Sequence, residues 1–312
     1  MREQALLRIS ELSRTFRARR GLFAPPVLLH AVNGVSLDLY KGESLGLVGE
    51  SGCGKSTLAR MLVGLLAPSS GSMEFDGRPA GDMKALRGRL QMVFQDPFSS
   101  LNPRMRVGDS VGEPLAVRGV PKAQIRERVA GSFALVGLPA EQARLFPHEF
   151  SGGQRQRIAV ARALITRPEV LVCDEPVSAL DASVQAQVLN LLRDVQERFG
   201  LSLLFISHAL AVVAFMCRRI AVMYLGRIVE LATRDELFQQ AAHPYSRALI
   251  AAMPSRARGL PPVLQGEPPS PLHPPAGCAF HPRCAQAAPV CREEVPALKE
   301  LGGGRLARCH LR

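Results

Sequence analysis

Residues 49–57 read Gly49-Glu50-Ser51-Gly52-Cys53-Gly54-Lys55-Ser56-Thr57, which fits the pattern G-x-x-x-x-G-K-S/T. The apolar run Ser44–Val48 just before it favours a buried strand, and a helix is expected from Lys55 onward. In such a loop, glycine lets backbone N–H groups curl around phosphate oxygens, and the helix N-terminus adds partial positive charge. Lys55 would reach the outer phosphates, and the hydroxyl of Ser56 would bind Mg²⁺. The stretch predicts a nucleotide phosphate site rather than an ordinary glycine-rich turn.

Two adjacent acids follow a second buried run. Asp174 and Glu175 come directly after Val170–Cys173. Asp174, at the carboxyl end of the expected strand, would hold Mg²⁺ directly or through water. The side chain of Glu175 points elsewhere because side chains alternate along a strand, and this suits a carboxylate that polarises an attacking water. Two solvated acids would be the simpler interpretation if the phosphate loop were absent.

Strands and helices alternate along the rest of the chain. Parallel strands need crossover connections, which helices supply, so this alternation predicts an α/β fold with a mostly parallel sheet covered on both faces. The expected strands lie within 28–54 and at 90–94, 170–173 and 201–206; the expected helices are 55–65, 183–199 and most of 107–164; and a hairpin is expected at 220–231.

Composition narrows the class of protein. The chain has 312 residues, of which 47% are apolar, and a formal net charge of +12. These values support a folded core and exclude a wholly disordered chain. The longest apolar run, Ala209–Cys217, is far below the roughly 18 residues of a membrane-spanning helix, and the first residues lack a signal-peptide core. We therefore expect a cytosolic chain, in which scattered arginines favour a basic surface over a nucleic-acid site.

Further motifs resemble those of ABC transporter ATPases. Ser151-Gly152-Gly153-Gln154 resembles the signature motif, and its spacing to Asp174-Glu175-Pro176 is similar to that of the family. Gln95 resembles the Q-loop glutamine, Asp181 the D-loop aspartate and His208 the switch histidine. The resemblance covers residues 28–231. It implies a P-loop NTPase fold, with a mostly parallel core sheet, an antiparallel β subdomain and a helical signature subdomain at about 100–165 within a nucleotide-binding domain, 1–240.

The resemblance also implies roles for individual residues. Two ATPase domains would meet head to tail, with each ATP between the phosphate loop of one and the signature residues Ser151–Gln154 of the other. Catalysis would rest on Glu175, His208 and Gln95. Mg²⁺ would be held through Ser56, Gln95 and Asp174. An aromatic residue upstream of the phosphate loop stacks on adenine in this family; Phe16 fits by its local setting, and Phe23, in the apparent insertion 17–26, is its rival.

One branch of the family fits best. The loop Gln95–Met105 and the segment His243-Pro244-Tyr245, which begins an extension over 241–312, resemble the dipeptide and oligopeptide importer ATPases. This resemblance implies a second ATPase subunit, two membrane-spanning permease subunits, an extracytoplasmic peptide-binding protein as an indirect partner, and a place on the cytoplasmic face of the membrane.

Importers of nickel or glutathione are the nearest alternatives. A soluble ABC ATPase acting on nucleic acid or ribosomes is disfavoured by the single phosphate loop, and an iron–sulfur protein with a degenerate ATPase by the intact Lys55 and Glu175.

Four cysteines cluster in the tail. Eight prolines occupy 254–275, and Cys278, Cys284, Cys291 and Cys309 follow, separated by five, six and seventeen residues. Thiols clustered in a reducing compartment are more often metal ligands than disulfides. The spacing matches neither a zinc finger nor the common ferredoxins, so zinc, a four-iron cluster and free thiols stay open, with His273, His281 or His310 as replacement ligands. Resemblance to related peptide-importer ATPases implies a 4Fe–4S cluster, with zinc as the alternative.

Overall fold

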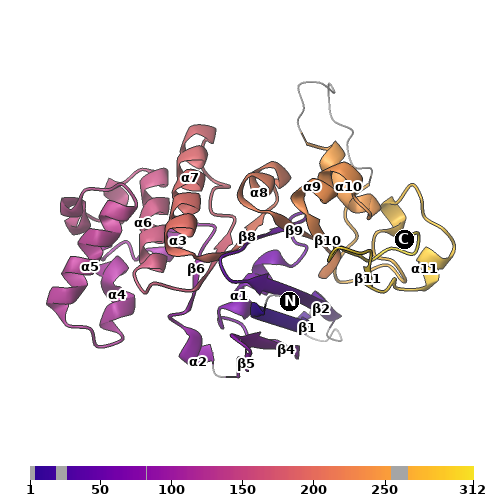
Figure 1. Cartoon of the computed structure of the whole chain (residues 1–312), viewed down its shortest axis with the longest axis horizontal. Coiled ribbons are helices and arrows are strands. Elements are labelled where there is room, and N and C mark those ends of the chain that lie inside the picture. The colour runs from indigo at the N-terminus through magenta and orange to yellow at the C-terminus, as the bar shows by residue number, and fades with distance from the viewer. Residues whose placement is uncertain (1–3, 19–26, 82, 254–265) are drawn as a thin grey trace.

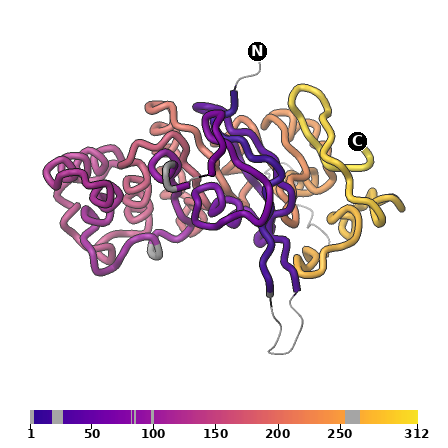
Figure 2. The backbone as a smooth tube through the Cα atoms, turned by 90° about the horizontal axis from the view of Figure 1, so that it is seen from below, coloured from indigo at the N-terminus to yellow at the C-terminus, as the bar shows by residue number. Residues whose placement is uncertain are grey.

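The computed structural model describes residues 4–18, 27–81, 83–253 and 266–312. A sheet occupies the centre, helices gather at one end, and the C-terminal residues lie at the other end (Figure 1). Viewed from below, the long first strands run across the middle of the molecule (Figure 2). Within the described ranges, every helix is too short or too polar to cross a lipid bilayer.

The larger sheet is mostly parallel at its centre. Among the described residues it has eight strands, in the order β11-β12-β10-β9-β3-β8-β7-β6. The neighbours β9, β3, β8, β7 and β6 are parallel, and β10 joins β9 as an antiparallel hairpin. The strands are β3 (Ser44–Val48), β6 (Leu90–Val93), β7 (Val170–Asp174), β8 (Ser202–Ser207), β9 (Arg219–Tyr224), β10 (Arg227–Thr233), β11 (Lys299–Glu300) and β12 (Leu306–Ala307).

A smaller antiparallel sheet lies beside it, in the order β2-β1-β4-β5. Its strands are β1 (Ala5–Ala18), β2 (Val27–Tyr40), β4 (Ser70–Phe75) and β5 (Arg78–Pro79). Buried leucines and valines of this sheet, such as Leu7, Val32 and Leu39, pack with Leu45 and Leu58 in one apolar cluster that joins both sheets. The predicted fold class, a mostly parallel core with an antiparallel β subdomain, is therefore confirmed.

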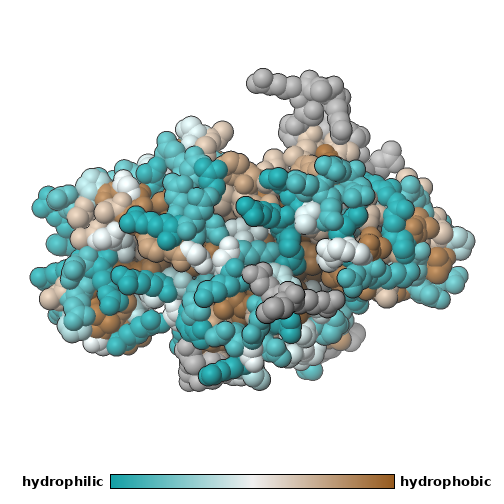
Figure 3. All heavy atoms as spheres, viewed as in Figure 1, coloured by the Kyte–Doolittle hydropathy of each residue, from teal (hydrophilic) through white to brown (hydrophobic). Residues whose placement is uncertain are grey.

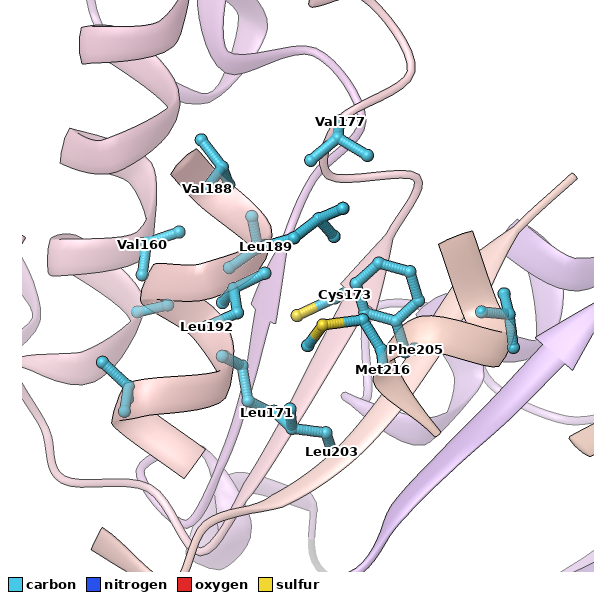
Figure 4. Close-up of a cluster of buried hydrophobic side chains, with 14 of the residues drawn as sticks. Val160, Leu171, Cys173, Val177, Val188, Leu189, Leu192, Leu203, Phe205 and Met216 are labelled. Atoms are coloured by element: carbon cyan, nitrogen blue, oxygen red, sulfur yellow. The ribbon is translucent and has the colours of Figure 1, made fainter. Parts of the chain in front are cut away.

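Helices cover the larger sheet and form a separate lobe. Figure 4 shows Val188 and Leu192 of α7 in one hydrophobic cluster with Leu171, Leu203 and Phe205 of the strands, and all five side chains are buried. The apolar run that is too short for a membrane span forms α8, which packs against β3 and β8. The elements are α1 (Lys55–Leu62), α2 (Met83–Leu86), α3 (Pro97–Ser100), α4 (Val107–Ala116), α5 (Lys122–Leu135), α6 (Gly152–Leu164), α7 (Ala182–Phe199) and α8 (Leu210–Met216), with the 3₁₀ turns η1 (Ala140–Arg144) and η2 (Pro147–Glu149).

The C-terminal extension packs onto the sheet. Its short strand β12 pairs with β10, so residues beyond 300 add to the edge of the larger sheet. Phe280, Cys291 and Cys309 are buried in it. The face of the molecule seen in Figure 3 is largely hydrophilic, and its apolar residues are scattered. The remaining helical elements are α9 (Arg234–Gln240), α10 (Pro244–Ala251), η3 (His281–Arg283) and α11 (Val290–Glu293).

Candidate active site

The predicted phosphate loop connects β3 to α1. Two of its glycines, Gly52 and Gly54, have positive φ angles of 77° and 108°. This conformation is unfavourable for residues that carry a Cβ atom. A Cβ atom at Gly49 would lie 2.2 Å from the carbonyl oxygen of Met223, so only glycine fits there. The loop thus has the tight curl that places backbone N–H groups around an anion.

Lys55 is buried at the first position of α1. Its Nζ donates hydrogen bonds to the carbonyl oxygens of Gly49, at 2.8 Å, and Glu50, at 3.0 Å. Cys53 is also buried, with Sγ 3.8 Å from Nζ, and burial raises the pKa of its thiol. The ammonium group is therefore held inside the curl of the loop, where it can bind a phosphate oxygen.

Ser56 and Asp174 meet between α1 and the end of β7. The Ser56 hydroxyl donates to Oδ1 of Asp174 at 3.0 Å. Asp174 is 3% exposed; burial raises the pKa of its carboxyl, and the hydrogen bond from Ser56 opposes that shift. A hydroxyl and a carboxylate are the oxygen ligands that Mg²⁺ prefers, so this pair fits the predicted metal site.

The three predicted catalytic residues are in contact, because the side chains of Gln95 and His208 both reach Glu175. Its Oε2 accepts a hydrogen bond from Nε2 of Gln95 at 3.3 Å and lies 3.0 Å from Nδ1 of His208. Glu175 has a φ angle of 47°, and its N–H donates to the carbonyl oxygen of Ile206 at 2.9 Å. A left-handed conformation at a residue other than glycine is strained and is common at functional sites. In this structure Gln95 contacts Glu175, whereas Ser56 contacts Asp174.

A cavity of about 700 Å³ brings these motifs together. Gly49, Cys53 and Asp174 are buried and are not among the described residues that line it. The described residues that line it are Phe16, Leu29, His30, Ala31, Glu50, Ser51, Gly52, Gly54, Lys55, Ser56, Thr57, Gln95, Glu175, His208, Leu225, Gly226, Leu249 and Pro271.

Phe16 reaches the cavity from β1. Arg14 lies over its ring, with the guanidinium carbon 4.8 Å from the ring centroid, so one ring face is already occupied. Phe23, the rival residue, lies outside the described residues. Sequence reasoning missed Leu249 and Pro271, which line the same cavity from the C-terminal extension. No local pattern marks either residue as part of a nucleotide site.

The signature residues open α6. The Ser151 hydroxyl accepts a hydrogen bond from the N–H of Gln154 at 3.3 Å, and Oε1 of Gln154 accepts one from the N–H of Ser151 at 3.0 Å. This reciprocal cap leaves Ser151 exposed at a helix N-terminus, a position suited to an anion. A Cβ atom at Gly153 would lie 2.2 Å from Cγ1 of Val184, so α6 and α7 approach closely there. Among the described cavity-lining residues, none belongs to the signature.

Asp181 caps α7 next to the signature. Its Oδ1 accepts hydrogen bonds from the N–H groups of Ser183, at 3.1 Å, and Val184, at 3.0 Å. These bonds lower the pKa of the Asp181 carboxyl. The predicted D-loop residue is thus an N-cap that orients the start of α7.

The four tail cysteines lie in one region of the extension. The N–H of Cys278 donates to the carbonyl oxygen of Cys291 at 2.8 Å. Burial raises the pKa of the Cys278 thiol, and negative charge on Cys291, Cys309 and Cys284 raises it further. Across the described ranges, however, no three His, Cys, Asp or Glu side chains converge in the arrangement of a metal-ion site.

Two of the predicted replacement ligands have backbone partners instead. Nδ1 of His281 lies 3.0 Å from the carbonyl oxygen of Cys278, and Nε2 of His310 lies 2.8 Å from that of Glu294.

Two solved structures with a similar fold are informative. The chain aligns with cbiO1 of Clostridium perfringens, part of the ABC transporter complex cbiONQ, at 29% identity and a TM-score of 0.65, covering 76% of this chain and 92% of that one. It aligns equally well, at a TM-score of 0.65 and 25% identity, with a dimeric ATP-binding cassette in a post-hydrolysis state bound to ADP and Pi, covering 73% of this chain and 98% of that one.

Sequence relatives extend over nearly the whole chain. A putative peptide import ATP-binding protein of Brucella abortus (strain 2308) is 50% identical over 99% of this chain and 95% of its own length. The oligopeptide transport ATP-binding protein OppF of Escherichia coli (strain K12) is 48% identical over 95% and 93%, respectively. The family profiles for ABC transporter and for oligopeptide/dipeptide transporter, C-terminal region, match residues 32–178 and 229–291. The chain therefore belongs to the ABC transporter family of ATP-binding proteins, in the group that carries this C-terminal region.

Proposed function

We propose that this chain binds and hydrolyses ATP to power an importer of dipeptides or oligopeptides. The observation that carries the ATPase assignment is the convergence of the phosphate loop, Glu175, Gln95 and His208 on one cavity. The transport assignment is supported by relatives named for peptide import and oligopeptide transport, which match this chain through its C-terminal extension.

The proposed chemistry assigns a role to each side chain. Lys55 binds the outer phosphates as a buried positive charge, and Ser56 with Asp174 holds Mg²⁺, which would neutralise phosphate charge when bound. The Glu175 carboxylate accepts a hydrogen bond from the attacking water and polarises it. Gln95 and His208 hold this carboxylate in place. Phe16 would offer its free ring face to adenine.

The proposed assembly needs a second ATPase subunit. Ser151 and its neighbours form an anion-suited helix start that is exposed and outside the described wall of the cavity. A head-to-tail partner, either a copy or a paralogue, would place its own signature residues over this cavity, and this chain's signature would serve the partner. Asp181, beside the signature, would lie at the same junction.

The membrane partners follow from the same proposal. Two permease subunits would dock near the loop 95–105, and a peptide-binding protein outside the cytoplasm would act through them. The chain would lie on the cytoplasmic face of the membrane as a peripheral subunit, without a nucleic-acid partner.

Transport by the assembled complex tests the peptide assignment. In proteoliposomes that contain the chain with its co-purifying membrane subunits and binding protein, we expect ATP-dependent uptake of labelled dipeptides or oligopeptides. Nickel and glutathione serve as competing cargoes in the same assay. ATP-dependent uptake of nickel or glutathione without peptide uptake would instead support the alternatives, and purification with ribosomes alone would remove the importer assignment.

We also propose that Cys278, Cys284, Cys291 and Cys309 jointly bind one metal centre, a 4Fe–4S cluster first and zinc second. The support is chemical: four cysteines cluster in the sequence of a proline-rich extension with little apolar content, the backbones of Cys278 and Cys291 are hydrogen-bonded, and metal binding would supply folding free energy. Anaerobically purified protein should contain about four iron and four sulfide per chain, and Cys284→Ser should lower both. Stoichiometric zinc without sulfide would replace the cluster, and metal-free protein with an ordered extension would refute both.

A further inference from the structure

Glu50, the second residue of the phosphate loop, is held by residues that lie far along the chain. Nη1 of Arg283 donates to Oε2 of Glu50 at 2.7 Å, and Nη2 donates to Oε1 at 2.9 Å. The hydroxyl of Tyr245 accepts a hydrogen bond from the N–H of Glu50 at 2.9 Å. Both the side chain and the backbone of Glu50 are thus fixed by the C-terminal extension.

The two side chains that hold Glu50 are themselves buried and tightly packed. The Arg283 side chain is 4% exposed, and Tyr245 is fully buried. The rings of Tyr224, Tyr245 and Phe280 pack against one another with centroids 4.6 to 5.4 Å apart. Phe280 directly precedes η3, which carries Arg283, so this aromatic cluster sets where the guanidinium lies. A bidentate pair of this kind, with its guanidinium buried, fixes the orientation of the carboxylate as well as its position.

The backbone at Tyr245, near the start of α10, is also held by hydrogen bonds. Nδ1 of His243 accepts the N–H of Tyr245 at 3.0 Å and caps α10. The buried carboxylate of Glu230 accepts the N–H groups of Ala242, at 2.7 Å, and His243, at 2.8 Å. Burial lowers the pKa of His243 to about 4, so the ring stays neutral and keeps Nδ1 as an acceptor at neutral pH. The support for Glu50 therefore runs back to β10 of the main sheet.

We propose that the C-terminal extension contributes to the nucleotide site, because its residues Arg283 and Tyr245 position the phosphate loop through Glu50. Glu50 belongs to the phosphate loop and is a lining residue of the cavity, so an unpaired charge on its carboxylate would act on phosphates bound there. Arg283 neutralises that charge and prevents it from repelling the triphosphate. Leu249 and Pro271 complete the contribution of the extension by lining the same cavity. This inference rests on ATP as the ligand of the cavity.

Binding of ATP and docking of the extension should therefore support each other. An ATP molecule that binds only the correctly held loop stabilises the contacts that hold it, because coupling between two sites is reciprocal. Arg283 and Tyr245 act as positioning residues, and their loss should affect ATP affinity more than the chemical step.

The central test is a pair of substitutions. Arg283→Gln leaves the Glu50 carboxylate unpaired, and we expect the affinity for a fluorescent ATP analogue to fall about tenfold, with the KM for ATP rising similarly and kcat changing less than about threefold. Adding Glu50→Gln to Arg283→Gln removes the unpaired charge and should recover most of the affinity. Arg305→Gln is the matched control, because that arginine also belongs to the extension but donates to the carbonyl oxygen of Gln240 outside the cavity.

Two results would overturn the proposal. One is an affinity of Arg283→Gln within twofold of the unaltered protein, and the other is a loss that Glu50→Gln does not relieve. If Arg283→Gln does not fold, hydrogen exchange of the unaltered protein decides: ATP should slow exchange over residues 278–292, and unchanged exchange there on ATP binding refutes the coupling. An unaltered protein that binds no ATP would instead refute the assignment of the cavity to ATP.

Discussion

Replacement of Glu175 by glutamine is expected to lower ATP turnover about a hundredfold or more while ATP still binds. The amide is nearly the same size as the carboxylate and can still contact Gln95 and His208, which both lie within hydrogen-bond reach of Oε2. It cannot accept a proton from the attacking water. The phosphate loop is unchanged, so affinity for ATP should stay within a few-fold of the unaltered protein. Phosphate release and equilibrium ATP binding measure the two effects separately.

Glu197→Gln is the matched control for this substitution. Glu197 is an exposed residue of α7, and its replacement should leave turnover unchanged. Turnover near the unaltered rate in Glu175→Gln would remove Glu175 from the catalytic role and leave the strained backbone at this residue without a chemical explanation.

Replacement of Lys55 by alanine is expected to weaken ATP binding about a hundredfold, in contrast to Glu175→Gln. The substitution removes a buried ammonium group that lies within the curl of the phosphate loop. It also removes two hydrogen bonds to the carbonyl oxygens of Gly49 and Glu50, so the loop loses part of its own support. Titration with ATP and Mg²⁺ by calorimetry measures the change directly.

Lys41→Ala is the control for the loss of one positive charge. Lys41 is exposed in the turn before β3 and lies outside the described wall of the cavity. Its replacement should leave ATP affinity unchanged. Equal affinities for Lys55→Ala and the unaltered protein would show that the cavity binds its ligand without the predicted lysine.

Local sequence patterns predict the central sheet well. The apolar runs at 44–48, 170–173 and 201–206 correspond to β3, β7 and β8, within one or two residues at each end. A run of this length, buried on both faces, is typical of a strand in the middle of a parallel sheet. The resemblance to ABC transporter ATPases implies that Lys55, Glu175 and His208 share one site, and all three line the same cavity at the carboxyl ends of these strands.

Contacts between distant segments could not be predicted in this way. Arg283 and Glu50 are 233 residues apart in sequence, and no periodicity connects them. The pairing of β12 with β10 likewise could not be predicted, because β12 has only two residues and carries no pattern of its own. The contact of the Gln95 side chain with Glu175 is a further detail that no local pattern indicates, and the role of Gln95 toward Mg²⁺ stays a prediction. Such details depend on tertiary packing, which overrides local preference.

The most direct test of the central claim is a structure of Glu175→Gln with ATP and Mg²⁺, determined with the partner ATPase subunit. We predict one ATP between Lys55 of this chain and the signature of the partner, with Ser151 of this chain facing the partner's nucleotide. ATP bound outside the cavity of this chain, or a complex in which Ser151 lies away from any nucleotide, would contradict the account.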